Sequence, residues 1–288
     1  MIGIEEYAFE LGRNVRTVED IAGTCTEEVV TNMRKIGLDR VPTDNERILW
    51  DMIKCAVGKI THKPDCILIA HSLPFIIQDN GADSIDGIPT YFISGLPCAI
   101  IHKTVQIACE HIYAGKYQKV LVIGADKAYS DQERIFFGTI MGDGVVALLL
   151  SEKATGNYIV SSQISTTIYA PDGENSNPDD IAEFRSRNVF MMREAINTCM
   201  NKAGIDKVNY FVTHTSNRGF WDGLSQACRL PRDMFLDGNI RNTGHMNSHD
   251  SFYHFFYWLH TGQLKKGDLV MLINPGFGGT QGCTLIEV

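Results

Sequence analysis

The apolar positions in the first half of the chain follow two alternating periods. Residues 46–60 carry apolar side chains at helical spacing, and an unbroken apolar run follows at Cys66–Ala70. Spacings of three and four residues are typical of a helix, whereas a short unbroken run is typical of a strand buried on both faces. The same order returns as a helix over 98–114, a strand over 120–123, and a turn with a buried strand over 141–150. The pattern therefore predicts alternating helices and strands.

The second half of the chain repeats this order. A helix is expected over 190–203, where a glycine ends it, and a strand over Tyr210–Thr213. Another helix is expected over 219–230, before a proline that cannot continue it. The last predicted elements are a helix over 245–261, an apolar strand after it, and a closing strand within 276–288.

The two halves also share a spacing. Cys98 and His245 each stand 17 residues ahead of a glycine, Gly115 or Gly262, that ends a helix and leads into an apolar strand. A chain that builds the same unit twice can place two helix N-termini against each other, and helix N-termini favour negative charge. We therefore expect Cys98 and His245 to meet at a centre suited to acyl-thioester chemistry.

Residues 155–187 are more polar than their surroundings and are expected to form a connecting loop between the halves. The halves are accordingly placed at 1–155, which carries the cysteine, and 156–288, which carries the histidines. Near-continuous apolar strands imply sheets that are covered on both faces. The fold class expected from this pattern is α/β.

Composition narrows the class of protein. The formal charge of −8 argues against a nucleic-acid-binding protein, which usually presents a basic face. Eight cysteines without a CxxC pair indicate a reducing, cytoplasmic setting rather than a disulfide framework. The N-terminal residues lack the features of a signal peptide, and no window approaches the roughly 20 apolar residues that span a membrane.

Two side chains are candidates for chemistry because of where the predicted elements place them. Cys98 follows the sharp turn Gly95-Leu-Pro97 and opens a helix, where a thiol becomes a better source of thiolate. His214 ends an apolar strand, where polar groups enter the clefts of α/β proteins. The alternatives are a buried structural cysteine and a histidine satisfied in the core.

The environment of His245 permits more than one interpretation, because His249, His254 and His260 follow it closely. Its spacing to His249, with Asp250 alongside, is that of a metal site, but no third well-placed ligand is evident. We therefore predict a catalytic His245 and no metal. Asn242 is the alternative residue for the same role.

Four motifs, in this order, resemble the β-ketoacyl-acyl-carrier-protein synthase III group of the thiolase superfamily. They are a cysteine at the start of a helix, here Cys98; a strand and Gly-Asp-Gly turn, here VLVIGAD and MGDG; a Val-x-His-x-x-Asn stretch, here from Val212 through His214 to Asn217; and a closing Gly-Phe-Gly turn, here Gly276 to Gly278. The resemblance implies a thiolase-like fold of two pseudo-symmetric halves in α-β-α-β-α layers. It covers the chain from about residue 46 onward.

The resemblance also implies roles. Cys98 is the expected nucleophile and His214 its partner, while the backbone N–H groups of Cys98 and Gly279 are expected to hold the oxyanion. The family usually carries Gly-Asn-Thr for the third catalytic residue, whereas the count from Gly262 places His245 there, in Thr-Gly-His. The residues expected to dock an acidic carrier protein are Arg218, Arg229 and Arg232.

The function implied is that of an acyl-thioester condensing enzyme in fatty-acid, polyketide or related biosynthesis. It takes thioesters of acyl carrier protein or coenzyme A without a cofactor, and it pairs with itself or with a related synthase. A malonyl-type acceptor implies decarboxylative condensation. The alternatives are an acyltransferase that does not condense, a catalytically silent partner subunit, and an unrelated binding protein on the same scaffold.

Overall fold

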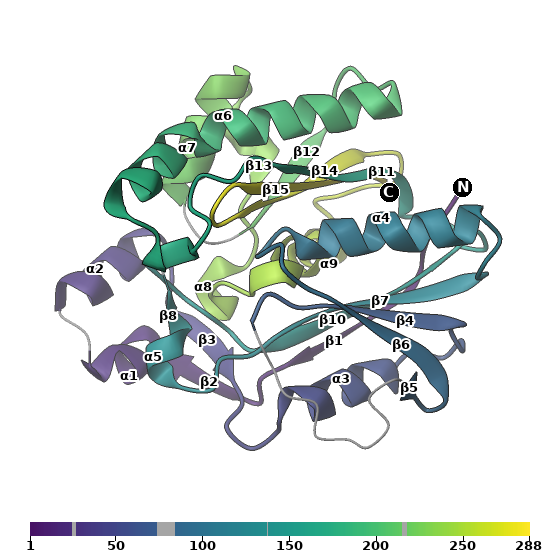
Figure 1. Cartoon of the computed structure of the whole chain (residues 1–288), viewed down its shortest axis with the longest axis horizontal. Coiled ribbons are helices and arrows are strands. Elements are labelled where there is room, and N and C mark those ends of the chain that lie inside the picture. Colours follow the sequence, from purple (N-terminus) through teal and green to yellow (C-terminus); the bar gives the residue numbers. More distant parts are fainter. Residues whose placement is uncertain (25–26, 74–83, 137, 215–217) are drawn as a thin grey trace.

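The chain folds into five layers of helices and sheets (Figure 1). Two helices, α4 (Ile100–Tyr113) and α9 (Asp250–His260), lie between two groups of strands. The outer face of one group is covered by α3 (Leu49–Val57), and that of the other by α6 (Pro178–Ala203) and α7 (Arg218–Cys228). This layering confirms the predicted α-β-α-β-α architecture. The residues that this computed structural model describes are 1–24, 27–73, 84–136, 138–214 and 218–288.

The strands of the two halves have the same order and the same directions. In each half the first strand is antiparallel to the second and the second to the third, while the third, fourth and fifth are parallel. The two groups join where Gly3 pairs with Tyr158. The first half contains β1 (Gly3–Leu11), β10 (Gly144–Ser151), β7 (Lys119–Asp126), β4 (Cys66–Ala70) and β6 (Ile88–Ile93), with β5 (Ser84–Ile85) at the edge. The second contains β11 (Tyr158–Thr166), β15 (Thr280–Glu287), β14 (Leu269–Gly276), β12 (Tyr210–Thr213) and β13 (Phe235–Leu236).

Short elements connect these layers. One group packs beside the centre of the molecule around the buried side chains of Val41 and Ile240. All the short elements together are β2 (Asn14–Thr17), α1 (Val18–Ile21), η1 (Ala22–Thr24), α2 (Glu27–Lys35), β3 (Arg40–Thr43), α5 (Asp131–Arg134), β8 (Ile135–Phe136), β9 (Thr139–Ile140), η2 (Gly173–Asn175), η3 (Arg232–Met234), α8 (Ile240–Thr243) and η4 (Asn247–His249).

The strands expected at Cys66–Ala70 and Tyr210–Thr213 are confirmed, and the helix expected from Cys98 begins two residues later, at Ile100. The prediction that a helix begins at His245 is wrong. Gly244 has φ 60° and ψ −154°, and Asn247 also has positive φ, so the backbone is not helical there. His245 instead pairs with Met141 as an isolated bridge.

The loop expected over 155–187 is also wrong, because this segment contains β11 and the first turns of α6. Asn177 caps α6, since its side chain accepts a hydrogen bond of 2.9 Å from the backbone N–H of Asp180. Pro178 follows at the first helical position, where its missing N–H has no cost. The polar residues that suggested a loop therefore mark the start of a helix. The boundary between halves at residue 155 stays a prediction.

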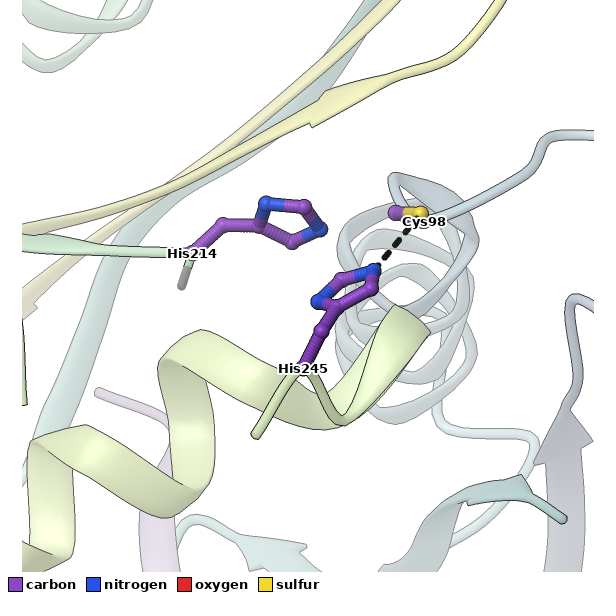
Figure 2. Close-up of side chains that lie close together, drawn as sticks. All are labelled: Cys98, His214 and His245. Atoms are coloured by element: carbon purple, nitrogen blue, oxygen red, sulfur yellow. Dashed lines mark hydrogen bonds between the residues drawn. The ribbon is translucent and has the colours of Figure 1, made fainter. Parts of the chain in front are cut away.

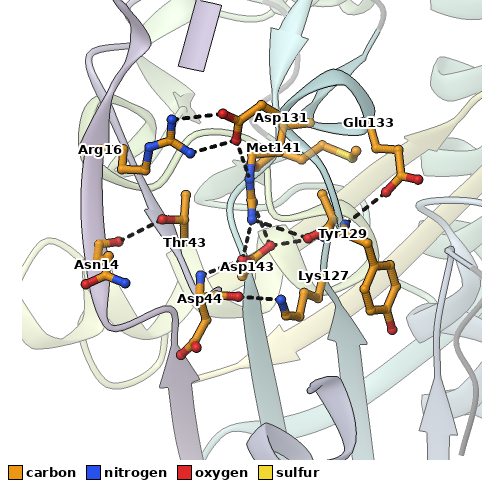
Figure 3. A network of polar contacts seen from close by, with 12 residues as sticks. Asn14, Arg16, Thr43, Asp44, Lys127, Tyr129, Asp131, Glu133, Met141 and Asp143 are labelled. Carbon is orange, nitrogen blue, oxygen red and sulfur yellow. Dashed lines mark hydrogen bonds and ion pairs between the residues drawn. The ribbon is translucent and has the colours of Figure 1, made fainter. Parts of the chain in front are cut away.

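The turn before β10 is fixed by Asp143. The guanidinium of Arg134 donates to both carboxylate oxygens of Asp143 at 2.6 Å. Asp44 donates its backbone N–H to the same carboxylate at 2.7 Å (Figure 3). Both side chains of the ion pair are buried. A buried charge that loses its partner is costly, so the pair holds the turn in one geometry.

We expect Asp143→Asn to lower the free energy of unfolding by about 3–5 kcal/mol, because it leaves the buried charge of Arg134 with only the partly exposed Asp131, at 3.8 Å, as a counter-ion. Denaturation by urea, followed by circular dichroism, measures this loss. Asp222→Asn is the matched control, since its ion pair with Arg232 is partly exposed. Its expected loss is about 0–1 kcal/mol. Equal losses in the two variants would contradict the prediction.

Candidate active site

Cys98 lies at the centre of the molecule, in the turn that leads into α4. The backbone N–H of Ile100 donates to the carbonyl of Pro97 at 3.0 Å, which closes this turn. The cysteine is buried, with 5% of its surface exposed. It lines a pocket of about 330 Å³, through which a substrate can reach its sulfur.

The structure brings His245 to this cysteine. Its Nε2 lies 3.7 Å from Cys98 Sγ, and its Nδ1 lies 2.9 Å from Asp250 Oδ2. The bridge to Met141 fixes the backbone at His245, and the carbonyl of Ile140 accepts the His245 N–H at 2.8 Å. A loop, rather than a helix N-terminus, therefore delivers the histidine.

His214 completes the cluster from the end of β12. Its ring lies against that of His245, with centroids 4.2 Å apart and an interplanar angle of 69°. One side-chain N or S atom from each of Cys98, His214 and His245 lies within 4.8 Å of the other two. Figure 2 shows the three side chains converging from separate elements. The prediction that no metal binds here stays a prediction.

The two histidines have opposite pKa shifts. Burial alone would lower the pKa of His245, but its hydrogen bonds to Asp250 and Cys98 outweigh burial and raise that pKa to about 10. Burial, together with the neighbouring charge of His245, lowers the pKa of His214 well below its usual value. His245 is therefore charged at neutral pH and His214 is neutral. A charged imidazole beside a sulfur stabilises the thiolate, which is the reactive form of cysteine.

The alternative residue, Asn242, lies in α8 and outside this cluster. Its side chain is exposed, and its Nδ2 donates to Asn239 Oδ1 at 2.7 Å. The structure therefore brings His245, and not Asn242, to the sulfur.

The pocket beside Cys98 has a mostly apolar wall, and Gly278 forms part of it. The neighbouring Gly279, predicted as an oxyanion donor, has φ 125°, and its N–H lies 3.4 Å from the carbonyl of Gly276. A side chain at this position would place its Cβ 1.9 Å from the carbonyl oxygen of Thr167. The turn therefore requires glycine, and the oxyanion role of Gly279 and of the Cys98 N–H stays a prediction. The described lining residues are Ser72, Leu73, Gly95, Leu96, Pro97, Cys98, Met141, Ile168, Ala170, Pro171, Gly173, Asn247, Phe277, Gly278 and Thr280.

Asn274, at the end of β14, is a site residue that the sequence analysis did not identify. Its Nδ2 donates to the carbonyl of Cys98 at 2.8 Å and to the carbonyl of Ser248 at 2.9 Å. It thus connects the turn of the nucleophile to the loop that carries His245. An asparagine within the apolar run LVMLINPG was the available signal, since a buried amide requires partners.

The three arginines expected to dock a carrier protein lie in and after α7. Arg218 pairs with Asp237 at 2.8 Å, and Arg232 pairs with Asp222 at 2.6 Å. Arg229 is exposed and has φ 56°. Two of the three charges are therefore balanced locally. Asn217, part of the histidine motif, lies outside the described residues.

We expect His245 to remain protonated to an unusually high pH. With its pKa raised to about 10, the ring carries its proton through neutral pH and loses it only as the pH rises through that value. The ¹⁵N spectrum of histidine-labelled protein measures this directly, and His245→Asn identifies the signal by removing it. A His245 ring that titrates near its usual pKa of about 6.5 would contradict the assigned contacts.

Comparison with known proteins agrees with this geometry. Two models of the 3-oxoacyl-[acyl-carrier-protein (ACP)] synthase III family match, one over residues 96–167 and the C-terminal one over 200–288, together more than half of the chain. Beta-ketoacyl-[acyl-carrier-protein] synthase III of Mycobacteroides abscessus is 25% identical over 251 residues, which cover 74% of this chain and 71% of the relative. That of Syntrophomonas wolfei is 25% identical over 295 residues, which cover 92% of this chain and 83% of the relative. Other curated relatives match over as little as 60% of their length.

The fold agrees over the whole chain. The crystal structure of 3-oxoacyl-[acyl-carrier-protein] synthase III from Aquifex aeolicus superposes with a TM-score of 0.81 at 21% identity and covers 100% of both chains. The family models and the curated relatives place the chain among the acyl-condensing enzymes of the thiolase superfamily. The chain belongs to the 3-oxoacyl-ACP synthase III family.

Proposed function

We propose that this chain forms an acyl-enzyme on Cys98 and condenses the acyl group with a malonyl-type thioester, in fatty-acid, polyketide or related biosynthesis. The observation that carries the proposal is the meeting of Cys98, His214 and His245 beside one pocket. A nucleophile, a charged partner at 3.7 Å and an approach route are the parts that covalent acyl transfer requires.

In the first half of the reaction, Cys98 Sγ attacks the carbonyl carbon of an acyl thioester. The N–H groups of Cys98 and Gly279 are the proposed donors to the oxyanion, and one such donor contributes about 2.7–4 kcal/mol to lowering a barrier. The first thiol then leaves, and the acyl group stays on the sulfur.

In the second half, a malonyl-type thioester enters the pocket. His214 and His245 donate hydrogen bonds to its carbonyl oxygen, which stabilises the enolate that forms when CO₂ leaves. The enolate carbon attacks the acyl carbon, and the C–S bond to Cys98 breaks. The product is a 3-oxoacyl thioester.

Intact-mass measurement tests this proposal in two stages. Incubation with acyl-CoA is expected to add the mass of one acyl group to the protein, and a malonyl thioester is expected to remove it with release of a 3-oxoacyl product. A silent partner subunit gives no adduct. A folded protein that gains no adduct from any short or long acyl donor contradicts the proposal.

The proposed partners are acyl carrier protein or acyl-CoA, with no cofactor, and a second subunit that is either a copy of this chain or a related synthase. The names of the curated relatives support a carrier-protein substrate. A cytoplasmic location is proposed because seven described cysteines are free, which fits a reducing compartment. None of the helices in the described part of the chain has the length and apolarity needed to cross a membrane.

For carrier-protein docking we expect Arg229→Glu to have the clearest effect among the three proposed arginines, because Arg218 and Arg232 already have acidic partners. The KM for an acyl-carrier-protein thioester should rise roughly 3- to 10-fold, through lost attraction to an acidic partner. The KM for acyl-CoA is the internal comparison, and Lys265→Glu is a control at an exposed position elsewhere. Equal rises for both substrates would exclude docking as the cause.

A further inference from the structure

Behind the catalytic cluster, one carboxylate lies between two histidine rings. Asp250 Oδ2 is 2.9 Å from His245 Nδ1, and Asp250 Oδ1 is 3.0 Å from His254 Nε2. All three side chains are buried. The proposed condensation assigns no role to Asp250 or His254.

The hydrogen bonds determine where the protons of these rings lie. The backbone N–H of Asn239 donates to His254 Nδ1 at 3.1 Å, so this nitrogen carries no proton. The proton of a neutral His254 is therefore on Nε2, which lies 3.0 Å from Asp250 Oδ1. The second oxygen of Asp250 accepts from His245 Nδ1. When His245 is neutral, its lone pair is consequently on Nε2, the atom that faces Cys98 Sγ.

We propose that Asp250 is a positioning residue that makes His245 a general base, and that acyl-Cys98 thereby also passes its acyl group to a hydroxyl or amine acceptor. The proposal rests on the acyl-enzyme of the proposed function. It adds a second class of acceptor and a chain of contacts, Cys98–His245–Asp250, that has the nucleophile, base and orienting carboxylate of a hydrolase triad.

The protons balance over a complete cycle. When the Cys98 thiolate attacks the first thioester, the leaving sulfur takes the Nε2 proton of charged His245 and departs as a thiol. Nε2 then holds a lone pair. The acceptor oxygen attacks the acyl carbon and forms a C–O bond, while its proton passes to Nε2. The C–S bond breaks, its electron pair returns to Cys98 Sγ, and the starting ion pair is restored.

A hydroxyl or amine acceptor suits this site because of the state of His245 Nε2 after acylation. Attack by a hydroxyl uses the lone pair that His245 Nε2 holds once the first thiol has left, whereas stabilisation of an enolate uses the same atom after it has taken up a proton from solvent. Among the described residues that line the pocket, Cys98 has the only ionisable side chain. A neutral acceptor with an apolar body fits this wall without an unpaired charge.

The other ionisable groups near the Asp250–His245 pair do not compete for the proton. Burial lowers the pKa of His249 to about 3 and that of His102 to about 4, and His214 is neutral for the same reason. Asp126 lies 4.0 Å from His249 and accepts from Ser248 at 2.7 Å. Burial would raise the pKa of Asp250, but its hydrogen bond to His245 and the neighbouring ring of His254 hold that pKa well below its usual value.

Discharge of a preformed acyl-enzyme tests the inference in the wild-type protein. The adduct on Cys98 is prepared with acyl-CoA and freed of excess donor, and it is then mixed with n-butanol, with hydroxylamine or with a malonyl thioester. General-base catalysis predicts ester or hydroxamate formation about 10²-fold or more above the rate of a free acyl thioester. Discharge by the malonyl thioester alone overturns the inference and leaves the proposed function intact. Failure to form the adduct at all is instead the failure of the proposed function.

Asp250→Asn separates positioning from a structural role. An amide oxygen accepts from only one ring, and His254 cannot change its tautomer while Asn239 donates to Nδ1. His245 must therefore adopt the other tautomer, in which the lone pair is on Nδ1 and the N–H is on Nε2. We expect discharge by n-butanol to fall about 100-fold more than discharge by the malonyl thioester. Equal falls overturn the inference.

The matched control is Asp126→Asn, which neutralises another fully buried carboxylate near the site. It contacts Ser248 rather than His245, so it is expected to leave the ratio of the two discharge rates unchanged. A change of that ratio as large as in Asp250→Asn attributes the effect to buried charge in general and overturns the inference. If Asp250→Asn does not fold, the rates at which n-butanol and hydroxylamine discharge the wild-type acyl-enzyme decide whether the inference holds.

Discussion

Cys98→Ala is expected to abolish the acyl-enzyme and to lower turnover by about 10⁵-fold or more, the scale seen when a covalent nucleophile is removed. The reason is chemical, because alanine offers no atom that can hold the acyl group. The substitution removes only a sulfur that lies at the pocket wall, so the fold should persist. Intact mass after incubation with acyl-CoA measures the adduct, and a steady-state assay measures turnover.

Cys109→Ala is the matched control for this experiment. Cys109 lies in α4, the helix that follows Cys98, and burial raises the pKa of its thiol to about 12. It is therefore an unreactive thiol in the same structural environment. An adduct that survives Cys98→Ala, or one that disappears in Cys109→Ala, would show that the nucleophile has been misassigned.

His245→Ala should lower turnover by about 10³- to 10⁴-fold, at the upper end of what one positioned acid–base group contributes. Both half-reactions should slow, since Nε2 contacts the sulfur during acylation and faces the acceptor afterwards. Rapid-mixing measurements of acylation and of discharge resolve the two steps.

Asn242→Ala provides the comparison, because this asparagine occupies the Asn-Thr motif but is exposed in α8. Its turnover should stay within about twofold of the wild type, as is usual for an exposed side chain without a special role. If Asn242→Ala reproduces the loss and His245→Ala does not, the third catalytic residue is Asn242.

Much of the fold was predictable where a short apolar run defines a strand. The run Cys66–Ala70 is buried at every position and is a strand over those bounds. The first strand, Gly3–Leu11, was not predicted because only part of it is buried and its sequence mixes charged and apolar residues. Its place between the two halves depends on pairing with residues far along the chain, which local pattern does not encode.

The candidate site was predictable in part. The matched spacing pointed to Cys98 and His245, and the structure brings them together although the helix predicted from His245 begins only at Asp250. The role inferred for Asp250 was not predicted. Its spacing to the histidines suggested a metal ligand, and only side-chain geometry shows its two oxygens directed at His245 and His254.

Asn274 has a consequence for transplanting this chemistry into another protein. Its amide joins the carbonyl of Cys98 to that of Ser248, one from each half of the chain, and touches neither reacting atom. A slide of either loop that lengthens one of these bonds beyond about 3.5 Å breaks it. A graft that copies Cys98 and His245 without Asn274 would therefore reproduce the reactive groups but lose the two hydrogen bonds that fix the distance between their loops.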